Sequence, residues 1–429
     1  MQEVIEITGG ASLQGSVAIS GAKNAALPIM IASLLCSEPC EFSNVPNLED
    51  TNLTYQLLEH FGATVGVAGD KVSISIPSLR ATEASFSIVK ALRASFWVLG
   101  PLLARGRAAR VALPGGDIIG ARPVDMHIAA LAQMGAEIRV KHGVVYATAV
   151  DGLKPAKIQF RFPSVGATHQ IIMAAALTPG VTTIEGAARE PEIEDLGRFI
   201  NACGGDVEGA GSDKVVIRGR ESLGGARHHL IGDRIEAGTF LLAGVATRGV
   251  VQAEGITPAH FGDFLELLQK INVTVETSAT SVSIDARREL RAVEVATGPF
   301  PKFATDLQAP MMAALCTVPG VSVIEENIFE GRYGHVSELC RMGAQITVQD
   351  RLATVQGGAR LSAAPVEAFD IRAGAALVIA ALSAEGVSQI HEPHHLRRGY
   401  DKLEQKLRGL GASIGARVAD GDDFALTGC

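Results

Sequence analysis

The sequence predicts an α/β protein made of six similar units that divide into two domains. Six times along its 429 residues, the chain places an apolar helix rich in small residues before a strand, an amphipathic helix and a short hairpin. Helices that alternate with strands indicate sheets covered by helices, and a period of roughly 70 residues is longer than that of solenoid repeats. Because 429 residues exceed one ordinary hydrophobic core, we expect three units per domain and a ligand cleft between the domains.

Each unit contains the same elements in the same order. The first three units occupy residues 25–76, 93–149 and 166–219, and the later ones begin near Ala237, Leu307 and Ala373. The first helices, such as GAALVIAALS at 374–383, are apolar nearly all round, so we expect them to be buried. The spacing of Leu57, Leu58 and Phe61 marks one apolar face of a second helix.

The second helices end at a common glycine step. The pairs are Gly62-Ala63, Gly135-Ala136, Gly204-Gly205, Gly343-Ala344 and Gly411-Ala412. Only the fourth unit departs from this pattern, with Asn272-Val273. The high glycine content, 47 residues without low-complexity runs, indicates many short connections between small elements.

Composition and charge exclude several classes of function. The chain is 47% hydrophobic with a formal net charge of −8, which argues against a protein that coats nucleic acid or an anionic membrane. An anionic ligand would therefore need a few focused arginines and lysines. The first residues, MQEVIEITGG, lack the features of a signal peptide, and apolar runs of about a dozen residues are too short to span a bilayer.

The cysteine spacing indicates reduced thiols. The six cysteines are Cys36, Cys40, Cys203, Cys316, Cys340 and Cys429. They contain no C-x-x-C pair and no zinc spacing. We therefore expect a cytoplasmic protein without a structural metal.

One loop presents an acid on a flexible backbone. In LPGGDIIGARPVDMH, residues 113–127, a Gly-Gly pair leads directly into Asp117, and Arg122 follows on the same loop. Glycines allow tight or mobile turns, so we expect this loop to present Asp117 and Arg122 as functional residues.

Eight blocks of the sequence together resemble one enzyme family. They are SGAKNAALP (20–28), LPGGDIIGARPVDMH (113–127), PSVGAT (163–168), AAREPEIEDL (187–196), GDRIEAGTF (232–240), FATDLQAP (303–310), DIRAGAALV (370–378) and RRGYDKLEQKLRGLGA (397–412). In this order they are similar to the UDP-N-acetylglucosamine enolpyruvyl transferases over essentially the whole chain. The resemblance implies the enolpyruvyl-transferase fold, with two inside-out α/β domains of three repeats each. It implies a discontinuous domain of residues 1–22 and 231–429, and a second domain, 23–230, that carries a catalytic lid near 113–123.

The resemblance also implies the reaction. Members of this family transfer the enolpyruvyl group of phosphoenolpyruvate to the 3'-hydroxyl of UDP-N-acetylglucosamine and release phosphate, the first committed step of peptidoglycan synthesis. It implies no cofactor and no metal. The expected partners are these two small-molecule substrates, with no nucleic acid and no membrane insertion.

Phosphoenolpyruvate carries a phosphate and a carboxylate, so its site needs several cations. Arginine binds such oxyanions in bidentate fashion. By resemblance, Lys23 and Asn24 contact phosphoenolpyruvate or the sugar nucleotide, and Arg122 and Arg398 face the phosphate region. Arg93 and Arg372 also match basic positions of the family, although a solvated surface cation is an equally good interpretation for these two.

The resemblance implies further substrate contacts. They lie at Pro123, Val124, Asp125, Met126, Ser164, Val165, Asp306, Ile328 and Asp370. Some relatives place a basic residue just before the Ser-Val-Gly of the uridine contact, whereas Phe162 and Pro163 precede Ser164 here. We therefore expect an apolar or backbone contact at that position.

Two acids have both a catalytic and a structural interpretation. Asp306 matches the carboxylate proposed to handle the proton of the sugar hydroxyl, but it also precedes an apolar helix and could be its N-cap. For Asp370, capping and substrate contact are equally plausible. Asp233 and Glu190 sit next to arginines in the sequence, and structural ion pairs explain them adequately.

Asp117 is the main departure from the family pattern. Most relatives carry cysteine here, regarded as the proton donor on a mobile lid, and a minority carry aspartate. A carboxyl group can serve as the acid if its pKa is raised when the lid closes and excludes water, although Arg122 nearby opposes that rise. Fosfomycin alkylates a thiolate, and Asp117 offers none, so we expect resistance to fosfomycin.

Three alternatives remain open. His391, His394 and His395 suggest a metal, but their spacing favours a simple loop cluster, as for His228 and His229. The sister reaction on shikimate 3-phosphate shares the fold, although that family typically has a Gly-Ser-Lys-Ser loop where this chain has GAKN at 21–24. An inactive paralogue that senses UDP-N-acetylglucosamine would explain Asp117 as the loss of a catalytic thiol.

Overall fold

The protein forms two compact units. The computed structural model describes residues 2–84, 89–90, 92–115, 119–120, 123–358 and 360–419. Unit 1 comprises Met1–Ile19, Ile118–Ala121 and Asp233–Cys429, and unit 2 comprises Ser20–Asp117 and Arg122–Gly232. Between its first and third segments the chain therefore passes from unit 1 to unit 2 after Ile19 and returns after Gly232.

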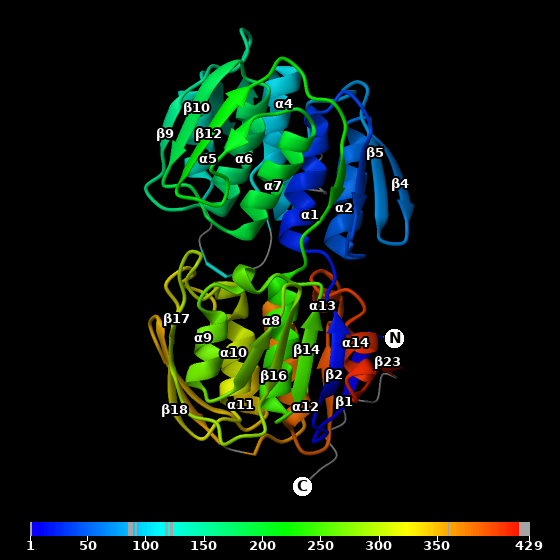
Figure 1. The fold of residues 1–429 in the computed structure, drawn as a ribbon, viewed down its shortest axis with the longest axis vertical. Helices are drawn as coiled ribbons and strands as arrows, with labels where there is room; N and C mark the ends of the chain where they lie inside the picture. The colour runs from blue at the N-terminus through cyan, green and yellow to red at the C-terminus, as the bar shows by residue number, and fades with distance from the viewer. Residues whose placement is uncertain are drawn as a thin grey trace. The chain divides into compact units, whose positions relative to one another are not determined.

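Five of the six copies have the helix, strand, helix and hairpin that the sequence predicts, whereas the described part of the sixth copy ends with the single strand β23 (Ser413–Ala419) (Figure 1). In unit 2 the first copy is α1 (Lys23–Ala32), β3 (Cys40–Ser43), α2 (Glu49–His60), β4 (Thr64–Ala68) and β5 (Lys71–Ser75). The second copy is α4 (Leu99–Gly106), β6 (Ala108–Ala112), α5 (Asp125–Gln133), β7 (Glu137–Lys141) and β8 (Val144–Thr148). The third copy is α6 (Val165–Ala176), β10 (Gly180–Glu185), α7 (Pro191–Ala202), β11 (Val207–Glu208) and β12 (Lys214–Gly219).

The copies of unit 1 follow the same order. The fourth copy is α8 (Arg234–Ala246), β14 (Val250–Glu254), α9 (Phe264–Lys270), β15 (Thr274–Thr277) and β16 (Ser281–Asp285). The fifth copy is α10 (Gln308–Leu315), β18 (Gly320–Glu325), α11 (Val336–Arg341), β19 (Gln345–Gln349) and β20 (Leu352–Gly357). The sixth copy is α12 (Ile371–Ser383), β22 (Val387–His391), α14 (Leu403–Gly409) and β23 (Ser413–Ala419). The N-terminal strand β1 (Gln2–Thr8) completes the last copy, because it pairs with both β22 and β23.

Five of the six sheets in the described residues have four strands in one order: a parallel edge strand, the strand after the first helix, and two antiparallel strands. These two strands form a hairpin in every such sheet except that of the last copy, where β1 and β23 take their places. The edge strands are β2 (Gln14–Ala18), β9 (Lys157–Gln159), β13 (Arg227–His229), β17 (Glu294–Ala296) and β21 (Pro365–Glu367). In the second copy the sheet β6-β8-β7 has three strands, and an isolated parallel bridge from Glu83 to Arg110 takes the edge position.

The first and fourth copies exchange their edge strands. β2 precedes α1 in the chain but lies parallel to β14 in unit 1, with Val17 opposite Ala253. β13 precedes α8 but lies parallel to β3 in unit 2, with His228 opposite Phe42. The passages of the chain after Ile19 and after Gly232 therefore each follow a strand that completes the sheet of another copy.

The first helices form the centre of each unit, and the sheets lie outside them (Figure 1). All 13 residues of α8 are buried, which confirms the prediction that these apolar helices are internal. The core of unit 2 is built in the same way around α1, α4 and α6. In the described part of the chain, no helix has the length and apolar character needed to cross a membrane.

The glycine step that ends the second helices has a conformational cause. Gly62, Gly135, Gly204, Gly343 and Gly411 all have positive φ angles, from 88° to 103°. Asn272, in the copy that departs from the pattern, has a φ of 73°, and its side chain donates a hydrogen bond of 2.7 Å to the carbonyl oxygen of Glu289. Asparagine is the residue other than glycine that best tolerates this conformation, so all six helices end in the same way.

Substitution of Asn272 tests this reasoning. We expect Asn272→Ala to lower the free energy of unfolding by about 1–2 kcal/mol, because alanine strains a left-handed backbone and loses the side-chain hydrogen bond. Asn272→Gly removes the same hydrogen bond without strain, so its cost should be smaller. Denaturant unfolding of the two variants measures the difference, and an alanine variant as stable as the glycine variant would contradict the explanation.

Candidate active site

The residues predicted for the site fall into two groups, one in each unit. Asp306, Ile328, Asp370, Arg372 and Arg398 belong to unit 1. Lys23, Asn24, Arg93, Pro123, Val124, Asp125, Met126, Ser164 and Val165 belong to unit 2. The predicted lid residues Asp117 and Arg122 lie outside the described residues.

Asp306 is held between two arginines. It lies in a short 3-10 helix, Thr305–Leu307, that precedes α10. Its Oδ1 accepts a hydrogen bond of 2.7 Å from Nη2 of Arg332, and its Oδ2 accepts one of 3.0 Å from Nη2 of Arg372. Both arginine side chains are 7% exposed and the aspartate side chain is 26% exposed. Since α10 begins without a side-chain cap, the N-cap interpretation of Asp306 is wrong.

The charges around Asp306 keep it ionised. Burial alone would raise the pKa of this carboxyl, but the positive charges of Arg372 and Arg332 outweigh burial and hold the pKa well below its usual range. Burial likewise disfavours the charged form of Arg372, yet the carboxylate of Asp306 outweighs it and raises the pKa of the guanidinium. The interpretation of Arg372 as a solvated surface cation is therefore wrong.

Glu326 fixes the backbone and side chains around this acid. Its buried carboxylate accepts a hydrogen bond of 2.8 Å from the hydroxyl of Thr305 and another of 2.8 Å from the backbone N–H of Ile328. Arg332 in turn donates to the Thr305 hydroxyl at 2.9 Å. The predicted contact Ile328 is thus linked to Asp306 through Glu326, Thr305 and Arg332. Sequence reasoning missed Glu326 and Arg332, which lie outside the quoted blocks.

Arg372 is also held from the other side. Asp370 caps α12 by accepting hydrogen bonds from the N–H groups of Arg372, at 2.7 Å, and Ala373, at 2.8 Å, so its capping role is confirmed. Nη1 of Arg372 donates to the hydroxyl of Tyr400 at 3.2 Å. Arg398, partly buried, lies two residues before Tyr400 at the end of the short helix α13 (His394–Arg397).

In unit 2, Lys23 forms a buried ion pair that the sequence did not reveal. Lys23 is the first residue of α1, and its Nζ lies 2.6 Å from Oδ2 of Asp50 in α2. The two side chains are 9% and 3% exposed. A buried ammonium paired with a buried carboxylate is not a solvated surface cation. Asn24, on the same first turn, is partly buried.

His127 is kept neutral next to Arg93. Its Nδ1 is hydrogen-bonded to Oε1 of the buried Gln170, and its ring meets that of Phe96 edge to face at 5.5 Å. Burial is the main cause that lowers the pKa of His127 to about 4, and the positive charge of Arg93 adds to it. Because the amide oxygen accepts the proton of Nδ1, the Nε2 atom is left as an acceptor.

The remaining predicted site residues of unit 2 lie at or just before the starts of α5 and α6. Ser164 caps α6 by accepting a hydrogen bond of 3.3 Å from the N–H of Ala167. Asp125, in the first turn of α5, pairs with Arg161 at 2.5 Å. Arg161, which directly precedes Phe162 in the sequence, is therefore paired with Asp125. Of the other predicted contacts, Val124 is buried, Val165 and Met126 are partly buried, and Pro123 is exposed.

The other acids and the histidines were given a structural interpretation from the sequence, and the structure places them as follows. Asp233 caps α8, accepting from the N–H groups of Ile235 and Glu236. Glu190 is the N-cap residue of α7 but makes no side-chain cap there. His228 pairs with Asp195 at 3.0 Å, and His394 with Glu392 at 3.1 Å.

Comparison with known proteins identifies the family. Residues 7–407 match the family described as EPSP synthase (3-phosphoshikimate 1-carboxyvinyltransferase). Two relatives from Trichlorobacter lovleyi and Geobacter metallireducens, both named UDP-N-acetylglucosamine 1-carboxyvinyltransferase, are 47% identical over 408 residues. The matches cover 95% of this chain and 97% and 98% of the relatives. The chain belongs to the UDP-N-acetylglucosamine 1-carboxyvinyltransferase family.

Solved structures show the same fold. The enolpyruvyl transferase NikO from Streptomyces tendae superposes with a TM-score of 0.88 at 26% identity, covering 98% of this chain and all of NikO. EPSP synthase from Acinetobacter baumannii has a TM-score of 0.75 at 18% identity, covering 97% of this chain and 100% of that one. The predicted enolpyruvyl-transferase fold is therefore confirmed, and as a member of the UDP-N-acetylglucosamine 1-carboxyvinyltransferase family the chain is a transferase.

Gly166 sets the position of His127 in this transferase. A Cβ on Gly166 would lie 2.9 Å from both Cε1 and Nε2 of His127, and 3.3 Å from Nε1 of Trp97. We expect Gly166→Ala to displace the imidazole and to lower the free energy of unfolding by about 1–3 kcal/mol, as overpacking does elsewhere. Denaturant unfolding measures the loss. Gly409→Ala is the matched control, because nothing lies within 4 Å of its added Cβ, and an equal loss in both variants would count against this account.

Proposed function

We propose that this protein transfers the enolpyruvyl group of phosphoenolpyruvate to the 3'-hydroxyl of UDP-N-acetylglucosamine and so begins peptidoglycan synthesis. Identity of 47% along nearly the full length to relatives named for this activity supports the proposal. The observation that carries it is the ionised carboxylate of Asp306 between Arg332 and Arg372. Such an arrangement suits a reaction that moves a proton beside an anionic substrate.

The chemistry requires two proton transfers in the addition step. The 3'-oxygen of the sugar forms a bond to C2 of phosphoenolpyruvate while its proton leaves to a base, and C3 takes a proton from an acid. Phosphate then leaves from C2 as a proton is lost from C3, which restores the double bond. The protein must therefore provide one acceptor, one donor and cations for the phosphate and carboxylate.

Asp306 is the acceptor in this proposal. Its two arginines lower its basicity, but they can also bind an anionic substrate. When phosphate or carboxylate oxygens take up part of the arginine charge, the carboxylate of Asp306 becomes more basic and can accept the hydroxyl proton. The arginines thus couple the binding of phosphoenolpyruvate to the activation of the base.

The cations and polar groups of unit 2 have binding roles. Lys23 and Asn24 contact phosphoenolpyruvate or the sugar nucleotide, and Arg93 supplies a further positive charge. The neutral imidazole of His127 offers Nε2 as an acceptor for a substrate hydroxyl or amide. The group around Asp125 and Ser164 serves the uridine part.

Asp117 is the proton donor, and Arg122 and Arg398 face the phosphate. A carboxyl group can protonate C3 if exclusion of water raises its pKa. In place of the thiol of most relatives, it also removes the nucleophile that fosfomycin alkylates. The proposed enzyme is therefore resistant to fosfomycin.

The experiment measures phosphate release from phosphoenolpyruvate with UDP-N-acetylglucosamine, with shikimate 3-phosphate, or with no acceptor. Each arm is repeated after incubation with fosfomycin, and the variant Asp117→Cys is treated in parallel. We expect release only with the sugar nucleotide, unaffected by fosfomycin, and time-dependent inactivation of the cysteine variant alone.

Each other outcome contradicts a specific part of the proposal. Inactivation of the unmodified protein by fosfomycin would leave the transferase intact but reject the role of Asp117. Release with shikimate 3-phosphate would favour the sister reaction. Binding of UDP-N-acetylglucosamine without turnover would indicate an inactive sensor.

A further inference from the structure

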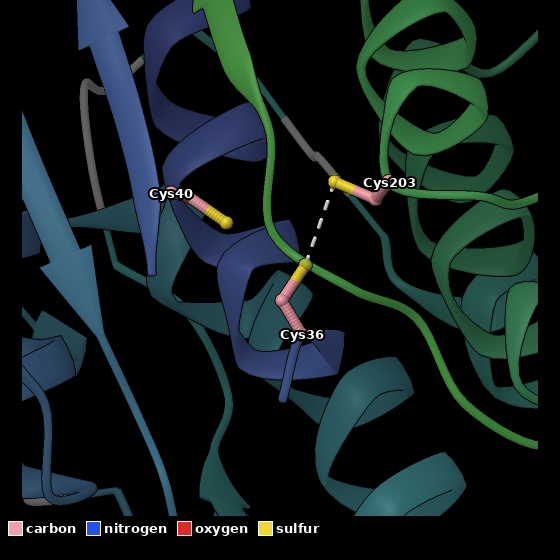
Figure 2. Close-up of side chains that lie close together, drawn as sticks. All are labelled: Cys36, Cys40 and Cys203. Carbon is pink, nitrogen blue, oxygen red and sulfur yellow. Dashed lines mark hydrogen bonds between the residues drawn. The ribbon is translucent and has the colours of Figure 1, made fainter. Parts of the chain in front are cut away.

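Three cysteine side chains converge inside unit 2, away from the residues assigned to the transfer reaction. The Sγ atoms of Cys36, Cys40 and Cys203 all lie within 4.8 Å of one another, and those of Cys36 and Cys203 are 3.6 Å apart (Figure 2). All three residues are buried. Cys36 follows the 3-10 helix after α1, Cys40 begins β3, and Cys203 is the C-cap residue of α7.

Backbone hydrogen bonds hold these three segments together. The stretch 223–226 runs between them: the N–H of Ser37 donates to the carbonyl of Leu223, and the N–H of Gly224 donates to that of Cys203, both at 2.9 Å. The N–H of Glu41 donates to the carbonyl of Ala226 at 2.9 Å. Hydrogen bonds therefore fix the backbone next to all three sulfur atoms.

The geometry of the sulfurs suits a metal ion with few ligands. A cation bound at about 2.3 Å to three sulfurs in a plane separates them by roughly 4 Å, which agrees with separations between 3.6 Å and 4.8 Å. In the described part of the chain, no histidine or carboxylate joins the three thiols as a fourth member. Structural zinc almost always takes four ligands, whereas copper(I) favours soft thiolates.

A guanidinium lies next to the cluster. The guanidinium of Arg105 donates to the carbonyl of Cys36 at 3.2 Å. A positive charge next to the cluster stabilises thiolates and offsets part of the negative charge of a complex of one monovalent cation with three thiolates.

We propose that Cys36, Cys40 and Cys203 form a binding site for one soft monovalent cation of the copper(I) type. Binding replaces the thiol protons with the metal and releases them to solvent. The site joins the ends of α1 and α7 to β3, so occupancy also stabilises unit 2. A surface hollow lined by Glu38, Pro39, Glu41, Gly225, Ala226 and Arg227 includes both chain neighbours of Cys40.

The test is an anaerobic titration of the full chain with copper(I) in competition with a coloured copper(I) chelator. We expect one ion per chain, three sulfur neighbours by X-ray absorption at the copper edge, and a rise in the melting temperature. Each of Cys36→Ser, Cys40→Ser and Cys203→Ser should weaken binding by at least about tenfold. Circular dichroism verifies that the variants fold, and Cys203→Ala replaces Cys203→Ser if that variant does not.

Two cysteines outside the cluster supply matched controls. Cys316 is buried and Cys340 is exposed, and we expect Cys316→Ser and Cys340→Ser to bind copper(I) as the unmodified chain does. Binding that persists when all three cluster cysteines are replaced, or that is lost with Cys340→Ser, would overturn the assignment. Tighter binding of zinc(II) with four protein ligands would overturn the three-coordinate site.

Discussion

Replacing Asp306 with asparagine is expected to reduce sugar-dependent phosphate release by on the order of 10²–10⁴-fold, the usual contribution of a positioned proton acceptor. Asparagine keeps the shape of the side chain and one oxygen for the arginines but cannot take the hydroxyl proton. Steady-state kinetics should show the loss mainly in kcat. A loss confined to KM would indicate that Asp306 only orients Arg332 and Arg372.

The same substitution has a structural effect that can be measured separately. It leaves Arg332 and Arg372, both 7% exposed, without their carboxylate, and breaking a buried pair in this way costs about 3–5 kcal/mol. Asp285→Asn is the control, because Asp285 also pairs with an arginine, Arg287 at 2.6 Å, but on the surface. Asp285→Asn should lower the free energy of unfolding by less than about 1 kcal/mol and leave kcat unchanged.

The pH dependence of stability gives a further check on Asp306. Its pKa is lower in the folded protein than in the unfolded chain, so the ionised carboxylate contributes its full stabilisation above about pH 4, the ordinary aspartate pKa. This contribution is lost as the pH falls from there toward the folded value. The difference in unfolding free energy between the unmodified protein and Asp306→Asn should therefore shrink below about pH 4, and a difference independent of pH would reject the charged pair.

The repeated elements could be predicted from the sequence because their signals are local. Apolar helices rich in small residues, hairpins and the glycine step recur with one period, and each follows from neighbouring residues. The exchange of β2 and β13 between copies has no such signal, nor does the closing of the last sheet by β1, where Glu6 lies opposite Gln389. Pairing between distant strands depends on the whole fold.

The site residues could be predicted from the sequence, but their partners could not, because the partners have no local signal. Lys23, Asp306 and Arg372 lie in blocks that resemble a family, whereas their partners do not stand out. Arg332 is a single arginine in EGRYGH, 26 residues from Asp306. The cysteine cluster was missed because Cys36 and Cys203 are 167 residues apart. The prediction of no zinc spacing also overlooked Cys36 and Cys40, whose spacing falls within the usual range for metal ligands.

The buried pair of Lys23 and Asp50 should be as important as Asp306. We expect Asp50→Asn to lower the free energy of unfolding by about 3–5 kcal/mol, because the ammonium of Lys23 then loses a carboxylate 2.6 Å away inside the protein. We expect Lys23→Met to be destabilising for the converse reason and to abolish measurable turnover, since the proposed role of Lys23 is to bind an anionic substrate. Lys214→Met, which removes an exposed ion pair to Glu185 at 3.9 Å, is the control and should change neither property.

A double variant separates the structural role of the pair from its role in catalysis. Lys23→Met combined with Asp50→Leu removes both charges and fills the space with apolar groups, and replacing a buried pair in this way is often neutral or stabilising. The double variant should therefore recover most of the stability lost in the single variants, so that ΔΔG values for the two sites are far from additive. Turnover should not recover, because no cation remains at position 23 to bind the substrate. If turnover returned with stability, Lys23 would serve only to hold α1 against α2.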